Sequence, residues 1–199
     1  ERNFRAAQAE YESAYERMPS NPLIVAGGTN AALESHNMDL AQRWLGRANE
    51  KMSANVQVQR ERERYLTFRG QYAESAQLGQ SVIAKLPNDR EGVDYLAYDL
   101  YYLGRYDEAL ALAKKYEPTL PNDKDLPLIA GNVYVRNGDL QAALENFTRA
   151  LELDPKMATG YVNRGFVWND LKQAAKASKD FQTALKLQPD YGEAHLGLA

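Results

Sequence analysis

Proline recurs at a fixed interval in this chain, and the interval limits the possible folds more than any other feature of the sequence. Four prolines lie 34 residues apart: Pro87, Pro121, Pro155 and Pro189. Residues 147–155 and 181–189 also read almost alike, FTRALELDP and FQTALKLQP. A fixed period of about 20–50 residues indicates short units that stack on one another, because one unit alone cannot bury its apolar side.

The same interval extends back to Ser53 and Pro19, near the beginning of the chain. If the proline closes each unit at position 32, five complete units follow one another: 22–55, 56–89, 90–123, 124–157 and 158–191. Residues 1–21 then form the second helix of a truncated unit, and residues 192–199 begin another. We expect one continuous domain that is a piece of a longer array. The unit 56–89 is the most divergent.

Within a unit, the spacing of apolar residues predicts two helices. In the third unit, four residues recur at the i, i+3, i+4, i+7 spacing of one helix face: Val93, Leu96, Ala97 and Leu100. Gly104 then makes the turn, because glycine tolerates the backbone angles that end a helix. Pro118 falls inside the second helix of this unit, so that helix should end near Tyr116 or bend there.

Two charged residues of the divergent unit stand where the other units carry packing residues. Arg62 takes a place filled elsewhere by Leu or Ala, and Glu63 takes a place filled by Gly or Ala. Buried charges require partners. We therefore expect either that the two residues pair locally or that this helix is rotated or loosely packed, which would make a soft joint in the array.

The period, the closing prolines and the small residues Gly131 and Gly165 resemble the tetratricopeptide repeat (TPR) family, whose 34-residue unit is a pair of antiparallel helices. The resemblance covers essentially the whole chain and is clearest in the last three units. It implies an all-α fold, a right-handed superhelical solenoid of antiparallel helix pairs. It also implies a non-catalytic scaffold that binds a peptide or protein segment, of open identity, in its concave groove.

Composition excludes several other classes of function. A net charge of −3 argues against general nucleic-acid binding, which needs a basic face. The chain has no cysteine, so disulfides and thiolate metal sites are excluded. No apolar run of about 18 residues predicts insertion into a membrane. The Ala- and Gln-rich repeats are compatible with a bacterial protein of either cytoplasm or periplasm.

The residues that usually carry chemistry are scarce. His36 and His195 are the only histidines, the first in a predicted turn and the second at a helix-packing position. Neither has a partner at the spacing that zinc catalysis uses. Gly27 and Gly28 lie in a predicted helix, where close packing explains Gly28 better than phosphate binding does. We therefore expect no enzyme activity, no metal and no cofactor.

The resemblance places the partner-binding surface on the first helix of each unit. It implies nine groove residues: Asn30, Arg60, Arg64, Asp94, Tyr98, Tyr101, Tyr102, Asn132 and Arg136. The same helix positions also include Glu34, Gln57, Phe68, Glu91, Asp125, Phe166, Asn169 and Asp170. Arg60 and Arg64 lie one turn apart, where together they could hold a carboxylate or phosphate, or could simply be solvated. The tyrosines are expected to form an aromatic patch for apolar side chains, the alternative being that they belong to the core.

One TPR subtype has a recognisable set of binding residues. Chaperone-adaptor TPR domains hold a C-terminal carboxylate with Lys and Asn in the first repeat, Asn in the second, and Lys and Arg in the third. The matching places here carry Ala26, Asn30, Arg64, Asp94 and Tyr98, of which only Asn30 agrees. That clamp is absent in this register. Two alternatives to a simple scaffold stay open: a homo-oligomer formed through open terminal helices or the tyrosine patch, and an accessory repeat region of a larger enzyme or signalling protein.

Overall fold

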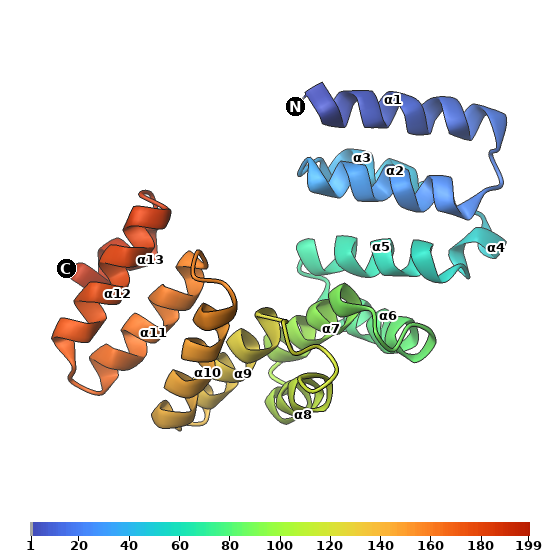
Figure 1. Ribbon diagram of the computed structural model, residues 1–199. Coiled ribbons are helices and arrows are strands. Elements are labelled where there is room, and N and C mark those ends of the chain that lie inside the picture. Colours follow the sequence, from blue (N-terminus) through green and yellow to red (C-terminus); the bar gives the residue numbers. More distant parts are fainter. Residues whose placement is uncertain (1) are drawn as a thin grey trace. The chain divides into compact units, whose positions relative to one another are not determined.

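The computed structural model describes residues 2–199, which form helices and turns and no strand. The helices follow in this order: α1 Arg2–Arg17, α2 Pro22–Glu34, α3 Met38–Gly46, α4 Glu50–Ser53, α5 Val56–Phe68, α6 Tyr72–Lys85, α7 Arg90–Tyr102, α8 Tyr106–Tyr116, α9 Asp125–Arg136, α10 Leu140–Leu153, α11 Ala158–Asp170, α12 Ala174–Leu187 and α13 Gly192–Leu198. The predicted all-α fold is confirmed. Neighbouring helices pack as pairs, for example α5 with α6 and α11 with α12 (Figure 1).

The chain divides into two compact units, one ending at Asp99 and the other beginning at Leu100, so that the division falls inside α7. In the first unit, α2 packs on α1, α3 and α5. In the second unit, α9 packs on α8 and α10, and α11 packs on α10 and α12. Each of these first helices packs against the second helix of the preceding pair and against the second helix of its own pair. In addition, α2 packs against α5, the first helix of the next pair.

The turns between paired helices repeat with the period of the sequence. Residues with positive φ stand one period apart at five turns: His36 (55°), Gly70 (70°), Gly104 (73°), Gly138 (77°) and Lys172 (61°). The left-handed region crowds the Cβ of any other residue against the backbone, so glycine is favoured there. The predicted role of Gly104 is confirmed, while His36 and Lys172 occupy the same strained conformation with a side chain.

A glycine of the first helix receives an aromatic ring from the second helix in two of the pairs. A Cβ built on Gly131 would lie 2.5 Å from Phe147, and one built on Gly165 would lie 2.7 Å from Phe181. Both rings are fully buried. Because such distances leave no room for a side chain, these glycines set how closely α9 approaches α10 and how closely α11 approaches α12.

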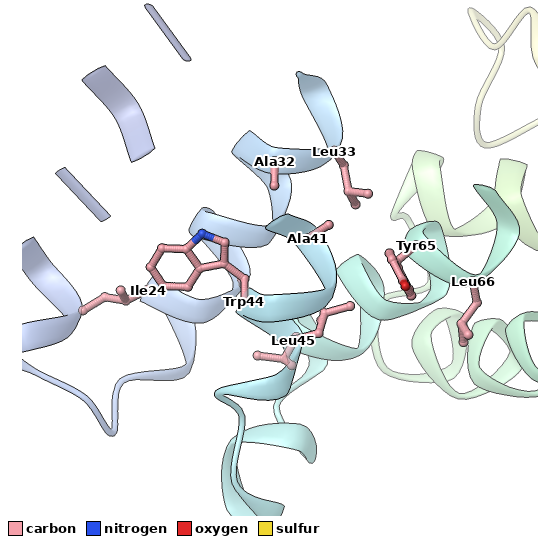
Figure 2. Close-up of a cluster of buried hydrophobic side chains, with 10 residues drawn as sticks. Ile24, Ala32, Leu33, Ala41, Trp44, Leu45, Tyr65 and Leu66 are labelled. Atoms are coloured by element: carbon pink, nitrogen blue, oxygen red, sulfur yellow. The ribbon is translucent and has the colours of Figure 1, made fainter. Parts of the chain in front are cut away.

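In the first unit a tryptophan, Trp44, takes part in the buried apolar cluster (Figure 2). Trp44 of α3 is fully buried, and a Cβ built on Gly28 of α2 would lie 2.4 Å from its ring. Tyr11 and Tyr15 of α1 meet the indole edge-on, with ring centroids 6.4 and 5.9 Å away. Gln8 of α1 accepts the indole N–H at 2.7 Å. The assignment of Gly28 to packing is therefore confirmed, and Trp44 anchors α1 to the first helix pair.

Helix ends follow local residues with one exception. α8 ends at Tyr116, as Pro118 predicts. The second helix of the first pair, however, is broken into α3 and α4, which the periodicity did not predict. Asn49 lies in the break and its side chain accepts from Met52 N at 2.9 Å, which caps α4. Arg47, also in the break, forms two hydrogen bonds of 2.8 and 3.0 Å to Glu12 of α1.

Gly131→Leu should destabilise the chain by about 1–3 kcal/mol, the usual cost of overpacking, because the new side chain has to displace Phe147. Urea denaturation followed by circular dichroism measures the change. Gly192→Leu is the matched control, since a Cβ at Gly192 meets nothing within 4 Å. Equal effects of the two substitutions would contradict the role assigned to Gly131.

Lys172→Gly should raise the free energy of unfolding by about 0.5–1 kcal/mol, because glycine relieves the left-handed strain at this turn at some cost in chain entropy. The matched substitution Lys179→Gly, at an exposed position of α12, should lower it by about 1 kcal/mol. Thermal or urea denaturation distinguishes the two. A loss of stability in Lys172→Gly would count against the strain.

Candidate functional site

Arg64 joins two neighbouring first helices of the first unit. From α5 it donates to Asn30 Oδ1 of α2 at 2.9 Å and forms an ion pair with the Glu34 carboxylate. Its guanidinium carbon also lies 5.5 Å from the ring centre of Phe68. The Arg64 side chain is only 10% exposed, whereas that of Glu34 is 48% exposed. Arg64 is therefore held beneath the surface, and Glu34 lies above it.

Arg60, one turn earlier on α5, is also occupied by carboxylates of the chain itself. It donates to Glu61 Oε1 at 2.9 Å and to Asp89 Oδ1 at 3.3 Å. The sequence led us to consider Arg60 and Arg64 as an open basic pair or as solvated side chains. Neither description fits, because carboxylates from distant parts of the sequence, Asp89 and Glu34, pair with these guanidiniums. A partner's acidic group would have to displace them.

Aromatic side chains lie beside these ion pairs. Phe68 at the end of α5 is 48% exposed and meets Tyr95 of α7 edge-on, with centroids 5.9 Å apart. Tyr98, one turn further along α7, is 42% exposed. Asp94 is half-buried, with a carboxylate oxygen 3.7 Å from Arg90 Nε. We call the surface formed by Asn30, Glu34, Arg60, Arg64, Phe68, Glu91, Tyr95 and Tyr98 the Phe68 face.

Burial raises the pKa of the Tyr95 hydroxyl to about 12. The Arg64 guanidinium acts in the opposite direction, while the carboxylates of Glu91, Glu61 and Glu34 add to the increase. Tyr95 therefore stays neutral at physiological pH. Three carboxylates from three helices therefore lie close enough to Tyr95, on the Phe68 face, to influence its pKa.

The second unit carries its own aromatic surface. Tyr101 meets Tyr102 and Tyr106 with ring centroids 5.4 and 5.5 Å apart, and its hydroxyl accepts from Arg136 Nε at 3.3 Å. Tyr102 is 50% exposed, and Arg136 is exposed and has no carboxylate partner among residues 2–199. We call this surface the Tyr102 face. Asn132, one turn before Arg136 on α9, accepts from Asn163 of α11 at 2.9 Å.

A cavity of about 310 Å³ lies in the second unit, between α8, α9 and α10. Its floor includes Leu126 and Ala130 of α9, and its rim carries Lys114, Glu117, Glu145 and Arg149. Glu117 stands at the repeat position that Leu151 and Leu185 occupy one and two periods later. The leucine side chain that fills this place in those repeats is therefore missing here. The rim carries two acids and two bases, so it does not select a ligand by charge.

A polar layer is buried between α5 and α6. Glu63 is fully buried, and neither of its carboxylate oxygens has a hydrogen-bond partner among the described residues. The expected pairing with Arg62 is wrong. Instead, a Cβ built on Gly79 of α6 would lie 2.3 Å from a Glu63 carboxylate oxygen, so the absence of a side chain at Gly79 makes room for Glu63. Two periods later the corresponding residues are Gly131 and Phe147, so the large and small partners are exchanged between the helices.

Burial without a partner raises the pKa of Glu63 to about 9, and the negative charges of Asp99 and Asp89 reinforce the effect more strongly than Arg60 opposes it. Asp99 of α7 is also buried; its Oδ1 lies 3.0 Å from the Thr67 hydroxyl, which in turn lies 2.8 Å from the Ser75 hydroxyl. Burial raises the pKa of Asp99 to about 6 although those hydroxyls favour its charged form. The fold therefore keeps Glu63 protonated at neutral pH.

Both histidines are exposed. His36 forms the first left-handed turn and is exposed. His195 is exposed on α13, with Nε2 2.8 Å from the carbonyl oxygen of Pro189, and Ala194 is the residue that packs inward. The expected packing role of His195 is therefore wrong. In residues 2–199, no helix is both long enough and apolar enough to cross a membrane.

Comparison with known proteins agrees with this architecture. Residues 131–168 match the family model described as TPR repeat. The DnaJ homolog subfamily C member 7 homolog of Dictyostelium discoideum is 28% identical over 158 residues, covering 71% of this chain and 29% of that protein. YrrB, a TPR protein with an unusual peptide-binding site, has a TM-score of 0.65 at 19% identity, over 94% of this chain and 96% of its own. A chain of the APC/C hetero-tetramer Cut9-Hcn1 has a TM-score of 0.85 at 16% identity, over 99% and 39%.

The repeated helix pairs, the left-handed turns at a constant interval and the matched segment together place this chain in the tetratricopeptide-repeat family. The two solved structures, at 19% and 16% identity, share its fold. The chain spans 29% of the Dictyostelium relative. TPR folds are typically non-catalytic scaffolds for protein–protein interaction.

Glu63→Gln should make the chain less sensitive to pH. The folded state retains a proton on Glu63 up to about pH 9, whereas the unfolded chain releases it near pH 4.5, so wild-type stability is full below pH 4.5 and falls as the pH rises towards 9. Glutamine cannot ionise, and the variant should exceed the wild type by at least about 1 kcal/mol at pH 8. Urea denaturation at pH 5 and pH 8 measures this.

Glu74→Gln, at an exposed position of α6, is the matched control and should follow the wild-type pH profile. If Glu63→Gln also follows that profile, the carboxyl group of Glu63 is not buried as described.

Proposed function

We propose that this chain is a non-catalytic scaffold that holds an extended or helical segment of a partner protein, with the Phe68 face of the first unit and the Tyr102 face of the second unit each a docking surface in its own right. One observation carries the proposal: large aromatic side chains of the first helices are exposed, with Phe68 at 48%, Tyr98 at 42% and Tyr102 at 50%. Neighbouring rings fix Phe68 and Tyr102 in place. A partner can cover such prearranged rings with little loss of side-chain entropy.

The remaining groove residues fit supporting roles. Arg60, Arg64 and Asn30 form the rigid base of the Phe68 face, and Asp94 lies on α7 between Glu91 and Tyr98. On the second unit, Arg136 and Asn132 offer donors and acceptors beside Tyr101. Such polar groups around exposed rings match the usual composition of a protein interface, aromatic at its centre and polar at its rim.

Two comparisons support a binding role. YrrB is a TPR protein with a peptide-binding site, and the Cut9-Hcn1 assembly shows a TPR-like chain within a complex. We assign no reaction, cofactor or nucleic-acid partner to the chain. Because it spans 29% of its Dictyostelium relative, a second candidate is the accessory repeat region of a larger protein. In that case the array would bring the larger protein to the same kind of partner.

Selection from a phage library of random peptides tests the proposal. Peptides enriched on the wild-type chain are measured again on a triple variant, Phe68→Ala, Tyr98→Ala, Tyr102→Ala, that circular dichroism shows to be helical. Loss of a central aromatic residue usually weakens an interface strongly, so binding should fall by at least about tenfold.

The matched control is Met18→Ala with Leu187→Ala, which removes exposed side chains that belong to neither face. Met18 follows α1 and is 52% exposed, and Leu187 ends α12 and is 39% exposed. Binding should be retained in this control. Peptides that bind the triple variant as tightly as the wild type would exclude the two faces as the docking surface.

A further inference from the structure

The Phe68 face carries more acidic groups than basic ones. Four carboxyl groups border it, and they are Glu34, Glu61, Asp89 and Glu91. The guanidiniums of Arg60 and Arg64 pair with three of these groups, Glu61, Asp89 and Glu34. Glu91 acts on Arg60, Glu61 and Tyr95, which places its charge at the same surface. Two negative charges are therefore left uncompensated when all four acids are ionised.

Two of these acids are well exposed to a partner, whereas the guanidinium of Arg64 is not. The side chains of Arg64 and Arg60 are 10% and 27% exposed, whereas that of Glu34 is 48% exposed and Glu91 is exposed on α7. Glu61 is buried, and its Oε2 has no hydrogen-bond partner in the described part of the chain. Arg64 lies beneath Glu34, whereas Arg60 is more exposed than Glu61 and Asp89 but is paired with both. The carboxylates that a partner meets directly are therefore those of Glu34 and Glu91, which make the exposed part of the face negative.

From this arrangement we infer that the Phe68 face recognises a segment in which lysine or arginine alternates with aromatic or aliphatic residues. The inference rests on the proposed scaffold function and names the chemistry of the partner for one of its two faces. A cationic side chain of the segment meets Glu34 and Glu91. An adjacent apolar side chain covers Phe68 and Tyr98.

An acidic segment fits this face poorly. To reach Arg64 it would have to break the ion pair with Glu34 and leave that carboxylate without its partner. It would also approach the uncompensated charge of Glu91. Electrostatic complementarity thus selects the sign of the segment, while the aromatic rings supply contact area that does not depend on charge.

Two capped peptides of about twelve residues test the inference: one alternates Lys with Leu and Trp, and the other replaces every Lys with Glu. Fluorescence anisotropy measures their binding to the full chain at low and high salt. The Lys peptide should bind at least about tenfold more tightly at low salt, and this preference should shrink as salt screens the charges.

Variants of the chain separate the local effect from its overall charge of −3. Glu34→Gln with Glu91→Gln should weaken binding of the Lys peptide by about threefold or more, whereas Glu74→Gln with Glu108→Gln removes the same number of charges from α6 and α8 and should have less than about half that effect. Equal effects of the two double variants would overturn the inference, as would tight binding of the Glu peptide.

Phe68→Ala distinguishes this inference from the proposal on which it rests. If both peptides depend on Phe68 but the Glu peptide binds as tightly as the Lys peptide, the scaffold function stands and the preference for a basic segment is wrong. If neither peptide depends on Phe68, the face is not a docking surface, and both proposals fail for the first unit.

Discussion

The structure depends on pairing one small residue with one large residue where two helices cross. Gly131 receives Phe147, Gly165 receives Phe181, and Gly28 receives Trp44. In each case a Cβ on the glycine would lie less than 3 Å from the ring, so the two side-chain volumes are complementary rather than interchangeable. This contact sets the distance between paired helices, and the distance in turn fixes which side chains of the first helices remain at the surface.

The second helix pair keeps this rule with the sizes exchanged. Glu63 is the large member and Gly79 the small one, so the space is filled, but it is filled by a carboxyl group without a hydrogen-bond partner among the described residues. An apolar residue would fill the space without that electrostatic penalty. The pair therefore packs closely and carries a proton at neutral pH, where an unpartnered carboxylate would be strongly disfavoured. The first unit consequently combines good steric packing with a stability that depends on pH.

The same close packing shapes the Phe68 face. Because α2, α5 and the beginning of α7 approach one another, long side chains from one helix reach acids on or beside the next, as Arg64 reaches Glu34 and Arg60 reaches Asp89. These pairs hold the guanidiniums in fixed positions, and Glu34 lies above Arg64. The TPR scaffold supplies the arrangement of helices, while the placement of a few charged residues decides what kind of segment the surface attracts.

Sequence alone determined the period, the all-α fold, the end of α8 at Tyr116 and the turn at Gly104, because these depend on proline, glycine and apolar spacing within a few residues of one another. It also placed Arg60, Arg64 and Tyr98 on first helices. Only the tertiary structure decided that Arg60 pairs with Asp89 and Arg64 with Glu34, that Glu63 is buried against Gly79, and that the helix after His36 breaks into α3 and α4. Those outcomes depend on contacts between residues far apart in the chain, whose distances are set by packing and not by any local pattern.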